Sequence, residues 1–417
     1  MVYYSPFTMP SIKPLKKLVT EARKLREHHK ERHRPSGFGF ALADRIDYLD
    51  NAQWDKVTAH DSLFLSRRYL RVLEEAGPEN LRPCYALVFR QKEPVAAVAA
   101  QQINVPLERL HKIPTSRLKK VGAARIDRHQ EKMLVCGNVL SWGMHGISFA
   151  PNENHESLWP AVAEAVYRLR RVDKLFGDTA FVMVKDIPDA FAASAQALSH
   201  FSYRELETEP NMVLDISPQW KNYDDYLASL NSKYRKQSKQ IDKEVATAGC
   251  TIENIKSDEI ARHAEELHEL YLQTHKNAKL RLVTLPIAFL PTLAERLGDD
   301  MRFTVLRKEE AILGFVTTVK DRETAVGYYI GFDRKANAEF PIYFRLLQSV
   351  IGHAIELGCT RLSLGRTALE PKARLGAHPE PLRIWLRHRI QPLNLVVRGL
   401  LHTISDHEEP PERNPFK

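Results

Sequence analysis

Residues 302–376 decide the fold. They open with three short apolar runs, Phe303-Thr-Val-Leu-Arg307, Ile312-Leu-Gly-Phe-Val-Thr-Thr-Val319 and Ala325-Val-Gly-Tyr-Tyr-Ile-Gly331. The runs are rich in β-branched and aromatic residues and are separated by charged turns, which predicts an antiparallel meander. A polar loop at residues 332–339 follows the third run.

A helix and a fourth strand are predicted after this loop. Pro341 begins a segment whose apolar residues recur at helical spacing up to Gly358, and proline first with glycine last is the expected helix punctuation. The run Arg361-Leu-Ser-Leu364 then ends in Gly365-Arg366. Free amides at a helix N-terminus can hold a phosphate, and a sheet whose strands part there can hold a thioester or an ester.

The order of meander, loop, helix and strand, followed by Lys372-Ala-Arg-Leu-Gly376, resembles the C-terminal domain of FemAB-like members of the GNAT N-acyltransferase superfamily. The upstream basic segment Ser232-Lys-Tyr-Arg-Lys236 is similar to that family too. One feature departs from the pattern. A GNAT phosphate loop is usually Gln or Arg followed by a Gly-rich pair, whereas Arg334-Lys-Ala-Asn-Ala-Glu339 contains no glycine.

The resemblance implies an α/β protein with tandem GNAT-like domains, each a mixed, largely antiparallel sheet flanked by helices. Strand-like runs near residues 84–90, 94–105, 133–137 and 179–185, with a helix near 157–170, repeat the order of the second half. We expect a basic amphipathic extension at 1–36, an N-terminal domain at 37–215, a C-terminal acyltransferase domain at 216–400 and a polar tail at 401–417. The two domains should meet near residues 211–222, and the helix at 341–357 should follow directly on the third strand of its sheet.

Composition is that of a soluble globular protein. The 417 residues are 43% hydrophobic and 27% charged, without an apolar stretch long enough to span a membrane. The N-terminus lacks an apolar signal core, and the four cysteines are widely spaced without a zinc pattern. We therefore expect a cytoplasmic protein with reduced cysteines and no metal site.

The basic charge is concentrated in two segments. Residues 1–36 hold nine Lys/Arg against three Glu, and residues 107–132 hold eight against three acids, whereas the whole chain has a net charge of +9. Local basicity of this kind indicates an anionic partner, either a membrane surface or tRNA. The alternative for residues 11–34 is a solvated helix packed on the body by Leu15, Leu18 and Leu25.

The resemblance also assigns candidate site residues. The backbone of Tyr329, Ile330 and Gly331 would hold the acyl carbonyl, with Tyr329 at the catalytic centre. Amides of residues 336–340, including Asn337, Ala338 and Phe340, would face the donor's phosphates beside Arg334 and Lys335. Asp333 and Glu339 are candidates for the general base, although each is equally compatible with an ordinary loop or helix-entry acid.

Four further residues are candidates for substrate binding. Arg366 and Lys372 would hold an anionic acceptor, and the alternative is exposed surface charge. Tyr234 and Arg235 are candidates through the resemblance, and the alternative is a solvated basic helix face. His145, in the loop from Asn138 to Gly146, is interpreted as structural because it has no evident partner in the sequence.

Motifs for other chemistries are absent. The chain has no H-E-x-x-H, Walker loop, G-x-S-x-G or G-x-G-x-x-G after a strand. We expect an N-acyltransferase in which an amine attacks a coenzyme A thioester directly, in a ternary complex. Two alternatives stay open: transfer from aminoacyl-tRNA to a cell-wall precursor or peptide, and a catalytically inactive GNAT fold that binds a membrane or nucleic acid.

Overall fold

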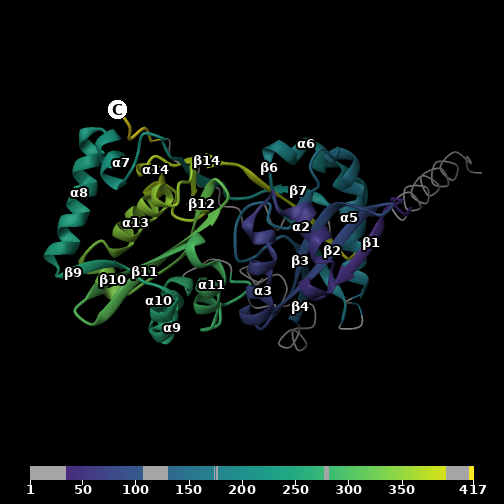
Figure 1. The fold of residues 1–417 in the computed structure, drawn as a ribbon, viewed down its shortest axis with the longest axis horizontal. Coiled ribbons are helices and arrows are strands. Elements are labelled where there is room, and N and C mark those ends of the chain that lie inside the picture. Colours follow the sequence, from purple (N-terminus) through teal and green to yellow (C-terminus); the bar gives the residue numbers. More distant parts are fainter. Residues whose placement is uncertain (1–33, 107–129, 173, 175–176, 277–280, 391–412) are drawn as a thin grey trace, which may run out of the picture.

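The computed structural model describes residues 34–106, 130–172, 174, 177–276, 281–390 and 413–417, and it contains two sheets side by side (Figure 1). Most of the predicted N-terminal extension, most of the basic segment 107–132 and most of the predicted tail lie outside the described residues. Within the described residues, no helix is both long and apolar enough to cross a membrane.

The first sheet has the order β1-β2-β3-β4-β6-β15-β7, with β5 paired to β3. Its strands are β1 (Gly39–Ala43), β2 (Leu81–Arg90), β3 (Glu93–Pro106), β4 (Gln130–Cys136), β5 (Ile147–Phe149), β6 (Thr179–Pro188), β7 (Arg204–Glu207) and β15 (Leu382–His388). Neighbours are antiparallel except β4 and β6, which run parallel and are connected through helix α5 (His155–Val172).

The second sheet has the order β14-β8-β13-β12-β11-β10-β9. Its strands are β8 (Asn211–Asp215), β9 (Cys250–Asn254), β10 (Met301–Lys308), β11 (Ala311–Asp321), β12 (Thr324–Phe332), β13 (Arg361–Ser363) and β14 (His378–Glu380). Here β12 and β13 form the parallel pair, connected through α12 (Arg334–Glu339) and α13 (Ile342–Glu356). The two sheets therefore repeat one plan, a meander followed by a helical crossover to a parallel strand, and the predicted fold class is confirmed.

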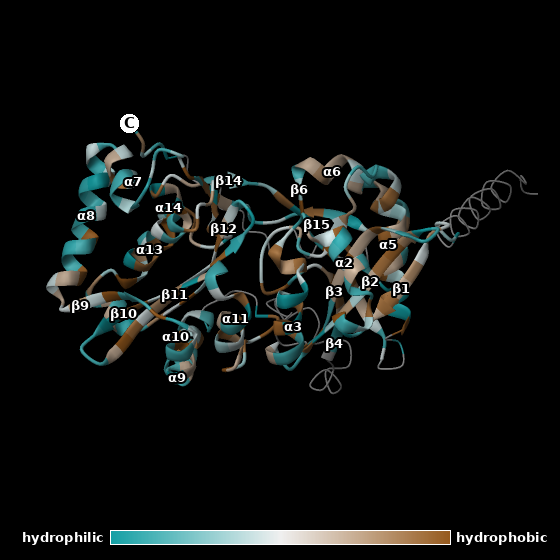
Figure 2. Cartoon of the chain, viewed as in Figure 1, coloured by the Kyte–Doolittle hydropathy of each residue, from teal (hydrophilic) through white to brown (hydrophobic). Residues whose placement is uncertain are grey.

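The other helices cover both sheets. They are α2 (Asn51–Thr58), α3 (Arg67–Ala76), α6 (Asp189–Ala195), α7 (Tyr223–Ser229), α8 (Ser232–Thr247), α9 (Ser257–Arg262), α10 (Ala264–His275), α11 (Phe289–Leu297) and α14 (Leu369–Arg374). Short 3-10 turns lie at η1 (Ile46–Tyr48), η2 (Leu63–Leu65), η5 (Gln196–Phe201) and η6 (Gly298–Asp300). The outer helix α8 is largely hydrophilic (Figure 2), and only Ser238 and Val245 are buried along its length.

One apolar core is shared by both halves. It joins Trp54 and Tyr69 of the first half to Leu270, Phe289 and Phe315 of the second. Helix α3 packs against α11 across this boundary. Separate cores lie between the first sheet and α5, and between the second sheet and α8, α13 and α14. Because burial of apolar area is the dominant favourable term in folding, the shared core ties the halves together.

Each half lends the other a strand. Strand β8, from the predicted N-terminal domain, lies between β14 and β13 in the second sheet, and β15 lies between β6 and β7 in the first. Figure 1 shows the chain crossing back from β14 toward the first sheet. The predicted boundary between residues 215 and 216 therefore differs from the structure in these two strands. The adjacent residues Trp385 and Leu386 are both buried, so β15 is covered on both faces, and its sequence does not show which sheet it joins.

Two local expectations also differ from the structure. The predicted loop at 332–339 contains α12, because the Asp333 side chain accepts a hydrogen bond from Ala336 N at 2.8 Å and caps the helix. Helix α12 therefore stands between the third strand and α13. The basic segment at residues 232–236 lies at the start of α8, which Asn231 caps.

Candidate active site

Strands β12 and β13 part from each other after a short contact. Residues 324–326 pair with residues 361–363, and β12 then continues to Phe332 while β13 ends at Ser363. A bulge in β12 places Tyr328 and Tyr329 opposite Thr317 of β11. The Tyr329 amide donates to Thr317 Oγ1 at 2.8 Å. Bulges re-aim side chains and end strand pairing, and they occur often beside functional sites.

A loop of the first half covers this parting. Within residues 137–146, Trp142 Nε1 donates to Ser363 Oγ at 2.7 Å, and Tyr329 Oη donates to the Leu140 carbonyl at 3.2 Å. A Cβ added at Gly365 would lie 3.0 Å from the Trp142 ring, so glycine allows this contact. The C-terminal ends of β12 and β13 are therefore lined by both halves of the chain.

A buried carboxylate joins the two halves at the same place. Asp186, at 0% exposure, forms ion pairs with Lys185 and with Arg366, which follows β13. Its Oδ2 also accepts from Gly143 N at 3.1 Å. Burial acts to raise the pKa of Asp186, but Lys185 and Arg366 hold it below its usual value. Burial lowers the pKa of Lys185 to about 8, and its Nζ donates to the Ser141 carbonyl at 2.7 Å.

Two tyrosines and an asparagine form a buried network beneath the loop. Tyr69 Oη and Tyr328 Oη are 2.7 Å apart, and Asn138 Nδ2 donates to Tyr69 Oη at 2.7 Å. Burial raises the pKa of both phenols. They therefore stay neutral and orient the loop against β12 instead of accepting protons from a substrate.

His145 is part of this interface. Its Nδ1 lies 2.7 Å from Ser141 Oγ, its Nε2 lies 3.6 Å from Asp321 Oδ2, and its ring stacks on Phe64. Burial lowers the pKa of His145 to about 3 and raises that of Asp321 to about 6. A neutral, packed imidazole fits the structural interpretation of this residue, and two of its partners, Phe64 and Asp321, come from distant parts of the sequence.

The predicted phosphate loop has its amides already engaged. The Asp333 carboxylate accepts from Ala336 N, and the Asp333 carbonyl accepts from Asn337 N at 2.9 Å. Asn337 Oδ1 in turn accepts from Tyr343 N in the first turn of α13 at 2.8 Å. The helix-end groups that would hold a pyrophosphate are thus capped by the chain's own side chains.

The other residues predicted to bind the donor lie around α12. Arg334, Asn337 and Ala338 line a cavity of about 450 Å³, whereas Ile330 and Phe340 pack against the core under α13. Lys335 and Glu339 are exposed. A Cβ at Gly331 would lie 2.7 Å from the Tyr271 backbone nitrogen, so this glycine allows α10 to approach β12.

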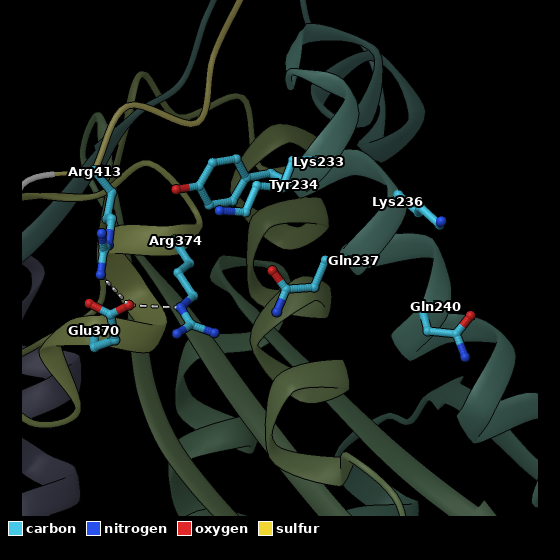
Figure 3. A pocket seen from close by; sticks show the side chains of 8 residues that line it. All are labelled: Lys233, Tyr234, Lys236, Gln237, Gln240, Glu370, Arg374 and Arg413. Carbon is cyan, nitrogen blue, oxygen red and sulfur yellow. Dashed lines mark hydrogen bonds and ion pairs between the residues drawn. The ribbon is translucent and has the colours of Figure 1, made fainter.

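Tyr234 and Arg235 lie at the start of α8 with different surroundings. Arg235 Nη1 donates to the Leu230 carbonyl at 3.1 Å and so caps the end of α7. Tyr234 lines a groove of about 580 Å³ between α8 and α14 (Figure 3). The structure therefore separates these neighbours: one lines a groove, and the other holds two helices together.

Lys372 is buried, at 4% exposure, which differs from the surface-charge alternative. Among the described residues it has no ion pair, and burial lowers its pKa to about 7. Glu209, two residues before Asn211, acts to raise this pKa. Asn211 Oδ1 accepts hydrogen bonds from Ser363 Oγ and Gly365 N, at the end of β13 where it parts from β12. Glu209 is therefore two residues from a residue that contacts this place.

Sequence reasoning missed Lys185, Asp186 and the role of Trp142. The signal for the first two was a pair of charges inside the otherwise apolar run of β6. Charged residues are almost never fully buried without a partner, so such a pair indicates a buried ionic contact. Within the described ranges no cluster of His, Cys, Asp or Glu is arranged to hold a metal ion.

Comparisons with known proteins agree with this architecture. Residues 232–373 match the model of the acetyltransferase (GNAT) domain family, and a search of curated proteins finds no match. The crystal structure of FemX is similar with a TM-score of 0.51 and 11% identity, covering 86% of this chain and 99% of that chain. A tandem GNAT protein from the clavulanic acid biosynthesis pathway, solved without AcCoA, has a TM-score of 0.51 and 10% identity, covering 84% and 98%.

At these identities the solved structures show the fold, and the family model adds the domain type for the second half. The sequence order from Ser232 to Gly376 and the strand plan of both sheets lead to the same assignment. Residues 232–373 therefore match an acetyltransferase (GNAT) domain, and the chain as a whole has the two-sheet fold of FemX and of the tandem GNAT protein.

Proposed function

We propose that this protein transfers an acyl group from a coenzyme A thioester to an amine at the junction of its two halves. The observation that carries the proposal is the parting of β12 and β13 beside the bulge at Tyr328 and Tyr329. An extended thioester arm fits along a strand whose neighbour has ended, since a parted strand offers unpaired backbone groups. Loop 137–146 borders this place through its hydrogen bonds to Ser363 and Tyr329.

The chemistry needs positioning and one proton acceptor. The lone pair of a neutral amine attacks the carbonyl carbon, the carbon–sulfur bond breaks, and the sulfur leaves as a thiolate that takes up a proton. The amine nitrogen loses one proton, so charges balance without a covalent enzyme intermediate. Holding both reactants side by side supplies most of the rate enhancement in such a reaction.

Lys372 is better suited to accept that proton than the acids chosen from sequence. Its pKa of about 7 leaves a large neutral fraction near neutral pH, which favours proton transfer. Asp333 is engaged as the cap of α12, and Glu339 is exposed. We therefore assign the proton-accepting role to Lys372 within this proposal.

A second candidate donor, aminoacyl-tRNA, is favoured by the charge of α8. Its cations Lys233, Arg235, Lys236, Lys239 and Lys243 span about 15 Å at the rise of an α-helix. That length matches several successive phosphates better than one pyrophosphate. The basic segments 1–36 and 107–132 would bind the same RNA or, alternatively, an anionic membrane surface.

Release of free thiol tests the first proposal. Purified protein is incubated with acyl-coenzyme A and a panel of amines, and charged tRNA with peptide amines is assayed in parallel. We expect amine-dependent thiol release, lowered about tenfold in Trp142→Phe because one hydrogen bond to Ser363 is lost. The control is Tyr48→Phe, at a residue that is 72% exposed.

The outcomes separate the candidates. If the aminoacyl ester is consumed and no thiol is released, the donor is aminoacyl-tRNA and not a coenzyme A thioester. Absence of both reactions at millimolar substrate would contradict acyl transfer and favour a binding module with a GNAT fold.

A further inference from the structure

We propose that the groove between α8 and α14 binds the phosphorylated end of a nucleotide, and that residues 413–417, here called the strap, build this groove. The inference rests on the proposed function for its ligand class, because both candidate donors end in a phosphorylated adenosine. It adds a site whose lining includes no residue of α12 or α13.

The groove combines an aromatic ring, amides and an excess of cations. It is lined by Lys233, Tyr234, Lys236, Gln237, Gln240, Glu370, Arg374 and Arg413. Its volume of about 580 Å³ lies in the usual range for sites that hold a small ligand. Four cations face a single carboxylate, so the lining has a formal charge of +3 and favours an anion.

One carboxylate orients both arginines of the groove. Glu370 Oε1 accepts from Arg374 Nε at 2.8 Å and from Arg413 Nη2 at 3.0 Å (Figure 3). These hydrogen bonds hold the pKa of Glu370 below its usual value, so it stays ionised. Each guanidinium has five N–H donors, so most of them remain for a phosphate. The arginines are therefore pre-oriented before any ligand arrives.

The opposite wall comes from α8. Tyr234 is half-buried, and Lys233 lies over its ring at 5.7 Å. Among the described residues, Lys233 and Lys236 have no carboxylate partner. A tyrosine face stacks on nucleobases of any sequence, and glutamine side chains such as Gln237 offer both a donor and an acceptor. The α8 side of the groove can therefore contact the base and sugar, and the side formed by Arg374 and Arg413 can bind the phosphate.

The strap fastens α8 to the body and completes the groove. Asn231 N donates to the Pro415 carbonyl at 2.9 Å, and Lys417 N donates to the Ser229 carbonyl at 3.1 Å. Asn231 is also the cap residue of α8. Since Arg413 lines the groove at the other end of the strap, the same five residues fix one wall and supply a cation to the other.

Phe416 anchors the strap in an aromatic socket. Its ring centroid lies 5.8 Å from that of Trp220 and 6.3 Å from that of Tyr226. A Cβ added at Gly376 would lie 2.4 Å from the Phe416 ring, so only glycine allows the ring to pack at this position. Gly376, the last residue of the segment 372–376 that resembles the GNAT family, therefore allows the strap to pack, and the strap in turn shapes the groove.

Calorimetric titration of the full chain tests the inference. The probes are adenosine 3′,5′-bisphosphate, adenosine, coenzyme A and a short single-stranded RNA ending in CCA. We expect saturable binding of the bisphosphate and much weaker binding of adenosine. Arg374→Gln should weaken the bisphosphate about tenfold, since a charge-assisted hydrogen bond is lost. The control is Lys92→Gln, at an exposed lysine between β2 and β3 that lies outside the groove lining.

The strap is tested by Phe416→Ala, with circular dichroism to verify that α8 and the fold persist. We expect weaker bisphosphate binding from this variant although Phe416 itself does not line the groove. If coenzyme A binds with the same affinity as the bisphosphate, the nucleotide recognised by the groove belongs to a coenzyme A thioester. If the RNA binds far more tightly than the bisphosphate, the nucleotide belongs to an aminoacyl-tRNA. Both results support the site.

Three results would overturn the inference: equal binding of adenosine and the bisphosphate, loss of binding in Lys92→Gln but not in Arg374→Gln, or unchanged binding in folded Phe416→Ala. Failure of the proposed function is distinguishable. If groove variants do not affect thiol release, the proposed acyl transfer stands and the groove is not its nucleotide site. If the groove binds the nucleotide but no acyl transfer occurs, the site stands and the proposed function fails.

Discussion

Lys372 shows how one side chain links stability to chemistry. Burial lowers its folded pKa to about 7, whereas its unfolded value is 10.5. Between these values the unfolded chain binds more protons, so the stability of the fold rises with pH across this window. Below pH 7 the full cost of the buried ammonium is present.

Replacing Lys372 by Met should therefore raise the melting temperature at pH 6. The gain should shrink as pH rises from about 7 toward 10.5, because the lysine is then neutral in both states. Thermal unfolding of the variant and the parent across this range measures the effect, with Lys236→Met on the exposed surface as control. A variant that melts lower at every pH would contradict the burial account.

The same residue predicts a pH profile for acyl transfer. If Lys372 accepts the proton, activity should rise with pH through about 7, where the amine becomes neutral. Lys372→Arg keeps a positive charge but should lose this rise and most of the activity, because a guanidinium does not deprotonate. Rates with saturating substrates from pH 5.5 to 9 provide the measurement. An unchanged profile in the variant would reject Lys372 as the proton acceptor.

At the scale of elements, the segment from β12 to α13 allows a test of whether its polar groups cap helices or bind a ligand. Asn337 Oδ1 accepts from Tyr343 N, so Asn337→Ala should lower the free energy of unfolding by about 1 kcal/mol through the lost cap. Nucleotide affinity should stay within about twofold of the parent. Urea unfolding and calorimetry measure both quantities, and Lys92→Ala, at an exposed residue between β2 and β3, is the control. A large loss of affinity with full stability would restore the predicted phosphate loop.

Elements were predictable where a local pattern specifies them. The β-branched runs gave β10, β11 and β12, and the apolar spacing after Pro341 gave α13. Helix α12 was missed although Asp333 is a good N-cap, since a six-residue helix has too short a periodicity to recognise. The site was less accessible to sequence, because Trp142, Asp186 and Arg366 meet only through tertiary structure.

At the scale of the whole molecule, the exchange of β8 and β15 makes the two halves of the chain interdependent. β15 fills the gap between β6 and β7, and β8 fills the gap between β14 and β13. The shared core and the ion pair of Asp186 with Arg366 add further contacts across the boundary. Both strands have adjacent buried residues and would fit either sheet, so the repeat was visible in the sequence and the exchange was not.

The exchange predicts a single unfolding transition for a chain with two sheets. Removing a buried tryptophan from β15 should destabilise the second half as well as the first. We expect Trp385→Ala, at 1% exposure, to lower the free energy of unfolding by about 3–5 kcal/mol. Separate reporters make the test specific: Trp159 fluorescence follows the first half, and Trp220, beside the strap, follows the second, each in a variant with the other tryptophans changed to Phe. If the halves are coupled, both reporters shift together, because β15 cannot leave the first sheet without pulling on β14. If the Trp220 transition stays in place while the Trp159 transition moves, the halves unfold independently, and the exchanged strands join them without making them one cooperative unit.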